Sequence, residues 1–190
     1  MPKGNDIPDF EKMAEELLKG LPMEVAELAL NHFDRSFIDQ GFTDTSFIAW
    51  PKRLDDQTFG LSHPLLNKSG ALQGSLMIKA ATMKRVEVAA GDNLRYAAIH
   101  NNGGTIRVTV TPKMRKFFWF VFTSLTKHYA SGAEPPPHIL KWKHMALTKK
   151  DTITIKVAKR QFIGQSEKLL KDVDQLIVNK ILTAFKNNTK

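Results

Sequence analysis

"TITIKVAKRQFIGQSEKLLKDVDQLIVNKILTAF" (Thr152–Phe185) joins a candidate strand to a long candidate helix near the end of the chain. Apolar and polar residues alternate over Thr152–Val157, which predicts a strand. From Gln165 to Phe185 apolar residues recur at three- and four-residue spacing, which predicts an amphipathic helix. The end of the chain therefore combines both kinds of element, and the preceding segments decide how they are assembled.

The N-terminal part has a helical pattern. We predict two helices, Asp9–Leu18 and Pro22–Gln40, because Gly20-Leu21-Pro22 interrupts the pattern and proline suits the first turn of a helix. From Phe42 to Pro64 the sequence is irregular, and Trp50 is expected to anchor this loop by packing beneath it.

The middle of the chain changes to a period of two, which is typical of strands. A short helix over Asn93–Asn101 is predicted here, with Asp92 as its N-terminal cap. Gly103-Gly104 ends this helix, because glycine readily adopts positive φ. Strands are predicted on both sides of it, at about residues 75–80, 84–90 and 105–110.

The next segment is rich in aromatic residues. Thr111 followed by Pro112 is typical of a helix start, so Pro112–Thr126 is predicted to be a helix. The alternative interpretation is that its run "FFWFVF" (Phe117–Phe122) forms a buried strand. A second short helix is expected around Ile139–Met145, after a proline-rich loop.

This order of elements predicts an α+β fold, with N-terminal helices, a small mainly antiparallel sheet and a long C-terminal helix. Strict alternation of strand and helix is missing, which argues against a parallel nucleotide-binding sheet. A chain of 190 residues fits a single domain over residues 1–190. Within that domain we interpret residues 111–150 as a basic helical elaboration.

Composition excludes several classes of protein. The chain has no cysteine, so it has neither disulfides nor thiolate metal sites. Its N-terminus lacks the apolar core of a signal peptide. The longest apolar run, Phe117–Phe122, is too short to span a bilayer. We therefore expect a soluble protein with no membrane partner.

The positive charge is concentrated in one segment. Between Lys113 and Arg160 lie eleven of the 28 basic residues but only two of the 19 acidic ones, so this segment carries the whole net charge of +9. A local excess of this kind indicates a face toward nucleic acid, an acidic protein surface or solvent. The candidate contact residues within it are Lys141, Lys143, Lys149 and Lys150.

Sequence signatures of catalysis are missing. The chain contains no glycine-rich phosphate loop, no His-Glu-x-x-His and no Gly-x-Ser-x-Gly motif. Its six histidines are scattered, and the six-residue separation of His138 and His144 is not a known ligand spacing. We therefore expect neither an enzyme nor a protein with a metal or other cofactor, and we interpret His100 as a structural residue.

Four separated stretches occur in an informative order: "SFIDQGF" followed by Trp50, "NKSGALQGSLMIKA" (Asn67–Ala80), "YAAIHNNGGTI" (Tyr96–Ile106) and "IKVAKRQFIGQSE" (Ile155–Glu167). Together they resemble the virion morphogenesis, or tail completion, family of Mu-like and P2-like tailed bacteriophages. The resemblance covers about Phe33 to Phe185.

The resemblance implies a structural role without catalysis. Such proteins complete the head-proximal end of the tail, or the neck, so that head and tail can join. The implied partners are other tail or neck proteins and further copies of the chain, in a virion component assembled in the cytoplasm of the bacterial host. The motif residues that it marks are Trp50, Gly70, Leu72, Ser75, Tyr96, His100, Gly103, Arg160, Phe162 and Gly164.

Packing and turn formation are the expected roles of these motif residues. Tyr96 is expected to face the sheet, and His100 to cap or hydrogen-bond the end of its helix. Phe162 is expected to pack in the core, and Gly164 to allow a tight turn before a cap at Gln165 or Ser166. Arg160 either orders that turn or faces a neighbouring subunit.

The main alternative is a nucleic-acid-binding module. Lysines and arginines mixed with aromatic residues in 113–160 are typical of a surface that binds the phosphate backbone and stacks on bases. The same aromatic residues can also be explained by core packing, so possible contact with DNA stays an alternative to contact with protein.

Overall fold

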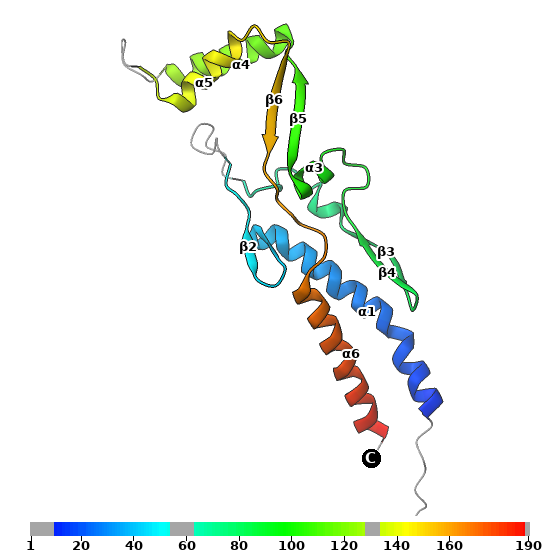
Figure 1. The fold of residues 1–190 in the computed structure, drawn as a ribbon. Coiled ribbons are helices and arrows are strands. Elements are labelled where there is room, and N and C mark those ends of the chain that lie inside the picture. Colours follow the sequence, from blue (N-terminus) through cyan, green and yellow to red (C-terminus); the bar gives the residue numbers. More distant parts are fainter. Residues whose placement is uncertain (1–9, 54–62, 128–133, 189–190) are drawn as a thin grey trace, which may run out of the picture.

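The computed structural model describes residues 10–53, 63–127 and 134–188. Two parts are visible in it (Figure 1). The body contains α1 (Phe10–Asp39) and α6 (Glu167–Asn188), which lie side by side. The arm extends away from the body as a ribbon of two strands, β5 (Gly104–Thr109) and β6 (Thr152–Val157), with two helices at its far end.

The N-terminal region forms one helix instead of the two that we predicted. The α1 helix continues through Pro22, although proline removes a backbone donor and costs about 3 kcal/mol inside a helix. Tertiary contacts explain this: Leu21 is buried, α1 packs along α6, and Lys180 of α6 forms an ion pair with Glu24. The interruption at Gly20-Leu21-Pro22 is unfavourable for a helix, but the packing of α1 against α6 outweighs this cost.

Two hairpins lie beside α1. The segment after α1, expected to be irregular, contains β1 (Gly41–Thr43) and β2 (Phe47–Ala49), and residues 54–62 of the same predicted loop lie outside the described part. A short 3₁₀ helix, η1 (Gln73–Ser75), leads into the second hairpin. That hairpin, β3 (Met77–Thr82) with β4 (Arg85–Ala89), agrees with the predicted strands and contacts α1.

The short central helix begins later than predicted. The α3 helix spans Ala97–Asn102, and the residues before it form turns. Asp92 does not cap it, because its carboxylate forms an ion pair with the ammonium of Lys79 at 2.5 Å. Gly103 ends α3 with a φ of 70°, as the glycine pair predicted.

The ribbon of the arm is amphipathic. Strands β5 and β6 pair over six residues each, with Ile106 opposite Ile155 and Val108 opposite Ile153. Because side chains alternate across a strand, these apolar residues share one face while threonines and basic residues share the other. The hydrogen bond from Val110 N–H to the carbonyl of Asp151, at 2.8 Å, extends the pairing to the base of the helices.

The helical hairpin, defined here as residues 111–150, contains α4 (Pro112–Thr126) and α5 (Pro137–Ala146). Thr111 caps α4, since its hydroxyl accepts a hydrogen bond from Met114 N–H at 3.2 Å. The aromatic run is therefore helical, and its interpretation as a strand is wrong. The two helices pack together around a small core formed by Phe118, Val121, Trp142 and Ala146.

The α+β fold class is confirmed, with a long C-terminal helix. In the described residues the strands form three separate two-stranded antiparallel sheets, where the sequence suggested one small sheet. No helix in the described ranges is both long and apolar enough to cross a membrane. In the described part of the chain, both strands of the ribbon connect the arm to the body (Figure 1).

Candidate functional site

The predicted motif residues gather where the arm leaves the body. We call this region the joint; its core consists of Phe37, Trp50, Leu72, Ala97 and Phe162. Phe162 is 1% exposed, and its ring lies 5.3 Å from that of Phe37, which also makes an edge contact with Trp50 at 5.7 Å. The expected packing of Trp50 and Phe162 is therefore confirmed.

Polar contacts fix the chain that enters α6. The indole N–H of Trp50 donates to the carbonyl of Gln161 at 2.7 Å. The side-chain oxygen of Asn101 accepts from the backbone N–H groups of both Phe162 and Ile163, at 2.9 and 3.1 Å. Sequence reasoning missed Asn101, which appeared only as part of an Asn-Asn-Gly-Gly turn, although asparagine is well suited to accept from backbone donors.

Arg160 orders the joint within the chain. Its Nε and Nη2 atoms donate to the carbonyl of Pro51 at 3.0 and 2.8 Å, and Nη2 also reaches the carbonyl of Lys52 at 3.4 Å. Its backbone N–H donates to the carbonyl of His100 at 2.8 Å. These contacts within the chain support the ordering of the turn, which is one of the two roles proposed for Arg160.

Tyr96 and His100 lie on the wall of a cavity of about 400 Å³, together with Leu72 and Arg160. Tyr96 is 41% exposed and contacts the edge of the His100 ring, so the expectation that it faces the sheet is wrong. His100 Nδ1 is buried without a hydrogen-bond partner among the described residues, so its backbone carbonyl, and not its ring, secures the helix end. Burial lowers the pKa of His100, and the nearby charge of Arg160 lowers it further.

The remaining motif residues form turns. Gly70 has a φ of 73° and Gly164 a φ of 148°, a region that disfavours side chains. At Gly103 a Cβ atom would lie 2.9 Å from the backbone nitrogen of Lys159, so the close approach of the chain that follows β6 also requires glycine here. Ser75 donates to the carbonyl of Leu72 at 2.6 Å and accepts from Gly91 N–H at 2.8 Å. These residues shape the chain around the joint.

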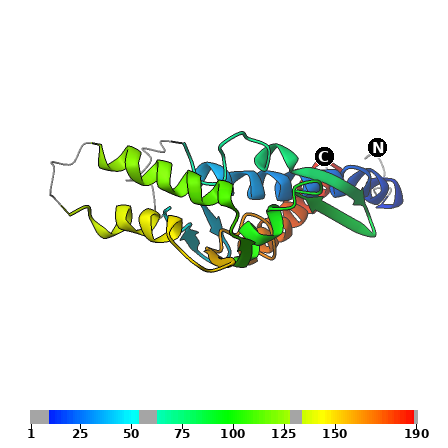
Figure 2. The ribbon, with the colours of Figure 1, turned by 90° about the horizontal axis from the view of Figure 1, so that it is seen from above.

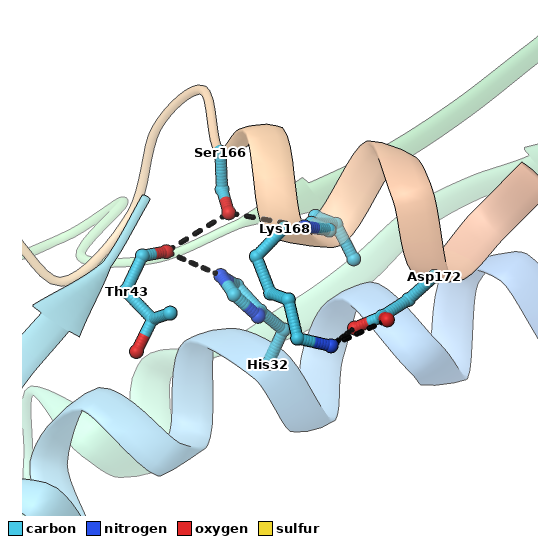
Figure 3. Close-up of polar contacts among 6 residues, drawn as sticks. His32, Thr43, Ser166, Lys168 and Asp172 are labelled. Carbon is cyan, nitrogen blue, oxygen red and sulfur yellow. Dashed lines mark hydrogen bonds and ion pairs between the residues drawn. The ribbon is translucent and has the colours of Figure 1, made fainter. Parts of the chain in front are cut away.

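A second polar cluster attaches α6 to the first hairpin (Figure 3). The carbonyl of Thr43 accepts from His32 Nε2 at 3.1 Å and from the Ser166 hydroxyl at 2.9 Å. The Ser166 hydroxyl also accepts from Leu169 N–H at 3.1 Å, which confirms Ser166 as a cap of α6. Beside it, Lys168 pairs with Asp172 at 2.5 Å. In the sequence His32 is one of six scattered histidines, and no motif marks it for this role.

Burial governs the protonation of His32. Desolvation lowers the pKa of His32, while the hydrogen bond to Thr43 and the charge of Asp172 act in the opposite direction. Since the carbonyl of Thr43 can only accept, Nε2 of the neutral ring carries the proton. The cluster lines a cavity of about 340 Å³, which also includes Arg35 and Asp39.

The helical hairpin, whose helices α4 and α5 lie side by side (Figure 2), has an unusual surface at the far end of the arm. Its small core buries one face of α4, whereas Phe117, Trp119 and Phe120 on the remaining surface are 52%, 44% and 65% exposed. Lys113 and Lys116 are exposed on the same helix. The sequence interpretation that core packing explains the aromatic residues therefore holds for only part of the run.

The four predicted basic contact residues fall into two groups. The ammonium groups of Lys141 and Lys143 lie 5.3 and 5.9 Å from the ring centroids of Trp142 and Phe122, at cation–π distance within the hairpin. Lys149 and Lys150 are exposed in the connection to β6. Lys141 and Lys150 border a groove of about 700 Å³ between hairpin and ribbon, whose apolar lining includes Met114, Phe118, Trp142, Met145, Ile153 and Ile155.

No group of three or more histidine, aspartate or glutamate side chains in the described ranges is placed to hold a metal ion. Comparisons with protein-family models, with curated proteins and with solved structures found no match. The candidate functional regions are therefore the two described above, the joint and the surface of the helical hairpin.

Proposed function

We propose that this chain is a structural protein of a tailed phage or prophage, which completes the tail end or neck and allows head and tail to join. It acts without catalysis, as several copies within the particle, and its partners are neighbouring tail or neck proteins. The observation that supports this role best is the helical hairpin, which presents exposed aromatic and lysine side chains at the end of an extended arm.

The use of the motif residues also favours an assembly role. Trp50, Leu72 and Phe162 are buried in the joint, and Arg160 binds backbone carbonyls of the same chain. Side chains occupied in this way position the arm relative to the body. A rigidly positioned arm with an apolar and basic tip is suited to contact another protein, because exposed apolar patches mark interaction sites.

The role of the arm can be tested by replacing residues 111–150 with the dipeptide Asn-Gly. Val110 and Asp151 are already paired, so a two-residue turn can close the ribbon there. We expect a folded body with an unchanged far-ultraviolet helical signal from α1 and α6. In a phage that depends on the chain, we expect separate filled heads and tails by electron microscopy.

Deletion of the whole gene provides the reference for this experiment. The deletion should also give unjoined heads and tails, and the wild-type chain supplied in trans should restore complete particles. Joined particles in the absence of the chain would overturn the proposed function. Joined particles with the Asn-Gly replacement alone would show that the arm is not the contact.

Nucleic-acid binding is the second candidate, favoured by the exposed Phe117 and Phe120, which share one face of α4 with the exposed Lys113 and Lys116. Such a surface can stack on bases and bind phosphates. Its signature is an affinity that falls steeply with salt, because phosphate contacts release counterions. Reversing the charges of Lys113 and Lys116 together with those of Lys141, Lys143, Lys149 and Lys150 should then weaken binding of single- and double-stranded DNA, and unchanged affinity would exclude this candidate.

A further inference from the structure

The first helix and the helical hairpin differ in net charge. The α1 helix contains seven acidic and three basic residues. The helical hairpin, residues 111–150, contains eight basic residues and one acidic residue. The N-terminal end of α1 and the helical hairpin lie at opposite ends of the structure, so they do not meet within one chain (Figure 1).

Both ends also carry exposed apolar side chains. On α1, the exposed residues Glu11, Glu15 and Leu18 follow one another at four- and three-residue spacing and therefore share one face of the helix, which we call the acidic face; Leu18 is 41% exposed. On α4, the aromatic residues Phe117 and Phe120 are exposed among lysines. The two surfaces are thus complementary in charge, and each can bury apolar area against the other.

From this complementarity we propose that copies of the chain associate head to tail, with the outer face of α4 of one copy on the acidic face of α1 of the next. This inference deepens the proposed function and rests on its premise that several copies assemble, and it names the partner of the hairpin as a second copy. A contact between two different surfaces is heterologous, so an open assembly of any length still offers one free surface of each kind, one at either end. Such a contact closes into a ring when its rotation permits.

Charge reversal on each surface tests the contact. One variant carries Lys113→Glu and Lys116→Glu, and a second carries Glu11→Lys and Glu15→Lys; all four side chains are exposed. Native mass is measured by light scattering behind a sizing column, across protein concentration and at low and high salt. We expect the wild type to associate at low salt, and each variant alone to associate at least about tenfold more weakly, as for juxtaposed like charges.

Two combinations restore the complementarity. An equimolar mixture of the two variants pairs a reversed α4 with a reversed α1, and a chain carrying all four substitutions does so with itself. Both should regain association to within a few-fold of the wild type. The matched control is Lys149→Glu with Lys150→Glu, which changes the net charge of the hairpin equally but lies in the connection after α5. It should associate nearly as well as the wild type.

Several results would overturn the inference. One is a wild type that stays monomeric at low salt at every concentration, and another is a charge reversal that leaves the association unchanged. The inference also fails if neither combination associates, or if the control variant associates as weakly as the α4 variant. The proposed function is tested by a separate measurement, the joining of heads and tails after deletion of the gene. Loss of joining on deletion together with a failed charge reversal would reject head-to-tail contact while leaving the proposed function in place.

Discussion

At the joint Phe37 and Phe162 are 2% and 1% exposed, whereas on the outer surface of α4 Phe117 and Phe120 are 52% and 65% exposed. The two regions have similar aromatic side chains and use them differently. At the joint, residues from several separate segments enclose each ring. At the hairpin, the described residues of α4 and α5 form a small core with Ile153 of the ribbon, and the outer face of α4 with Phe117 and Phe120 stays exposed.

The comparison indicates that the residues of the joint stabilise the fold, whereas the exposed residues of the hairpin are available for contact with other molecules. Substitutions at the joint should therefore reduce stability, and substitutions on the outer face of α4 should reduce association at unchanged stability. Exposed positions away from special features usually change stability by less than about 0.5 kcal/mol.

The largest difference is expected from truncating one phenylalanine in each region. Phe162→Ala should lower the free energy of unfolding by about 3–5 kcal/mol, because it removes a fully buried ring and leaves a cavity. Phe120→Ala, the matched control, should stay within about 0.5 kcal/mol of the wild type. Chemical denaturation followed by circular dichroism measures both, and equal losses would abolish the distinction between the regions.

A smaller effect is expected at Asn101, which joins α3 to the chain before α6. Asn101→Leu removes the acceptor of two backbone N–H groups and should cost about 1–3 kcal/mol. Asn101→Asp keeps an oxygen acceptor and should retain most of the stability. The denaturant midpoints of the two variants are the measurement. Two equally destabilised variants would show that loss of these hydrogen bonds is not the cause of the lower stability.

The hairpin should have its own, more local sensitivity. Thr111→Ala removes the cap of α4 and should cost about 1 kcal/mol. Because Thr111 lies at the base of the hairpin, amide hydrogen exchange should accelerate in α4 and α5 more than in α1 and α6. Thr111→Ser retains the hydroxyl and serves as the control. Uniform acceleration across α1 and α4 would mean that arm and body unfold as one unit.

The smallest effect concerns pH and the two half-buried histidines His32 and His100. The pKa values of His32 and His100 lie below the ordinary 6.5, so near that pH the unfolded chain binds protons that the folded chain does not. Stability should be independent of these groups above pH 6.5 and should decrease as the pH falls from there through the folded pKa values. His32→Gln keeps an N–H donor for Thr43 and should make this decrease shallower in urea denaturation between pH 7.5 and 5; an unchanged slope would contradict it.

Local signals explain what could be predicted from the sequence. The start of α4 at Pro112 and the strand Thr152–Val157 were predicted within the observed bounds, because a Thr-Pro cap and strict alternation need no distant partner. Trp50 and Phe162 were recognised as packing residues. Trp50 was selected by its place in the irregular segment 42–64 and Phe162 by the resemblance to tail completion proteins, and the structure places both in one core.

Other features depend on contacts between distant segments. Continuation of α1 through Pro22 depends on α6, more than 100 residues away along the chain, which no local pattern can reveal. The pairing of β5 with β6 depends on the helical hairpin between them. Asn101 acts on backbone groups 61 and 62 positions further along the chain, so only the folded structure shows its role.

The pairing of Val110 with Asp151 has a consequence for how this gene changes over time. The two ends of the forty-residue segment 111–150 lie on neighbouring strands, about 5 Å apart, which is the spacing of paired strands. An in-frame insertion or loss between these two codons leaves the remaining backbone in place. Relatives that recognise different partners are therefore expected to differ in length and composition here, while the sequence around Trp50 and Phe162 keeps its spacing.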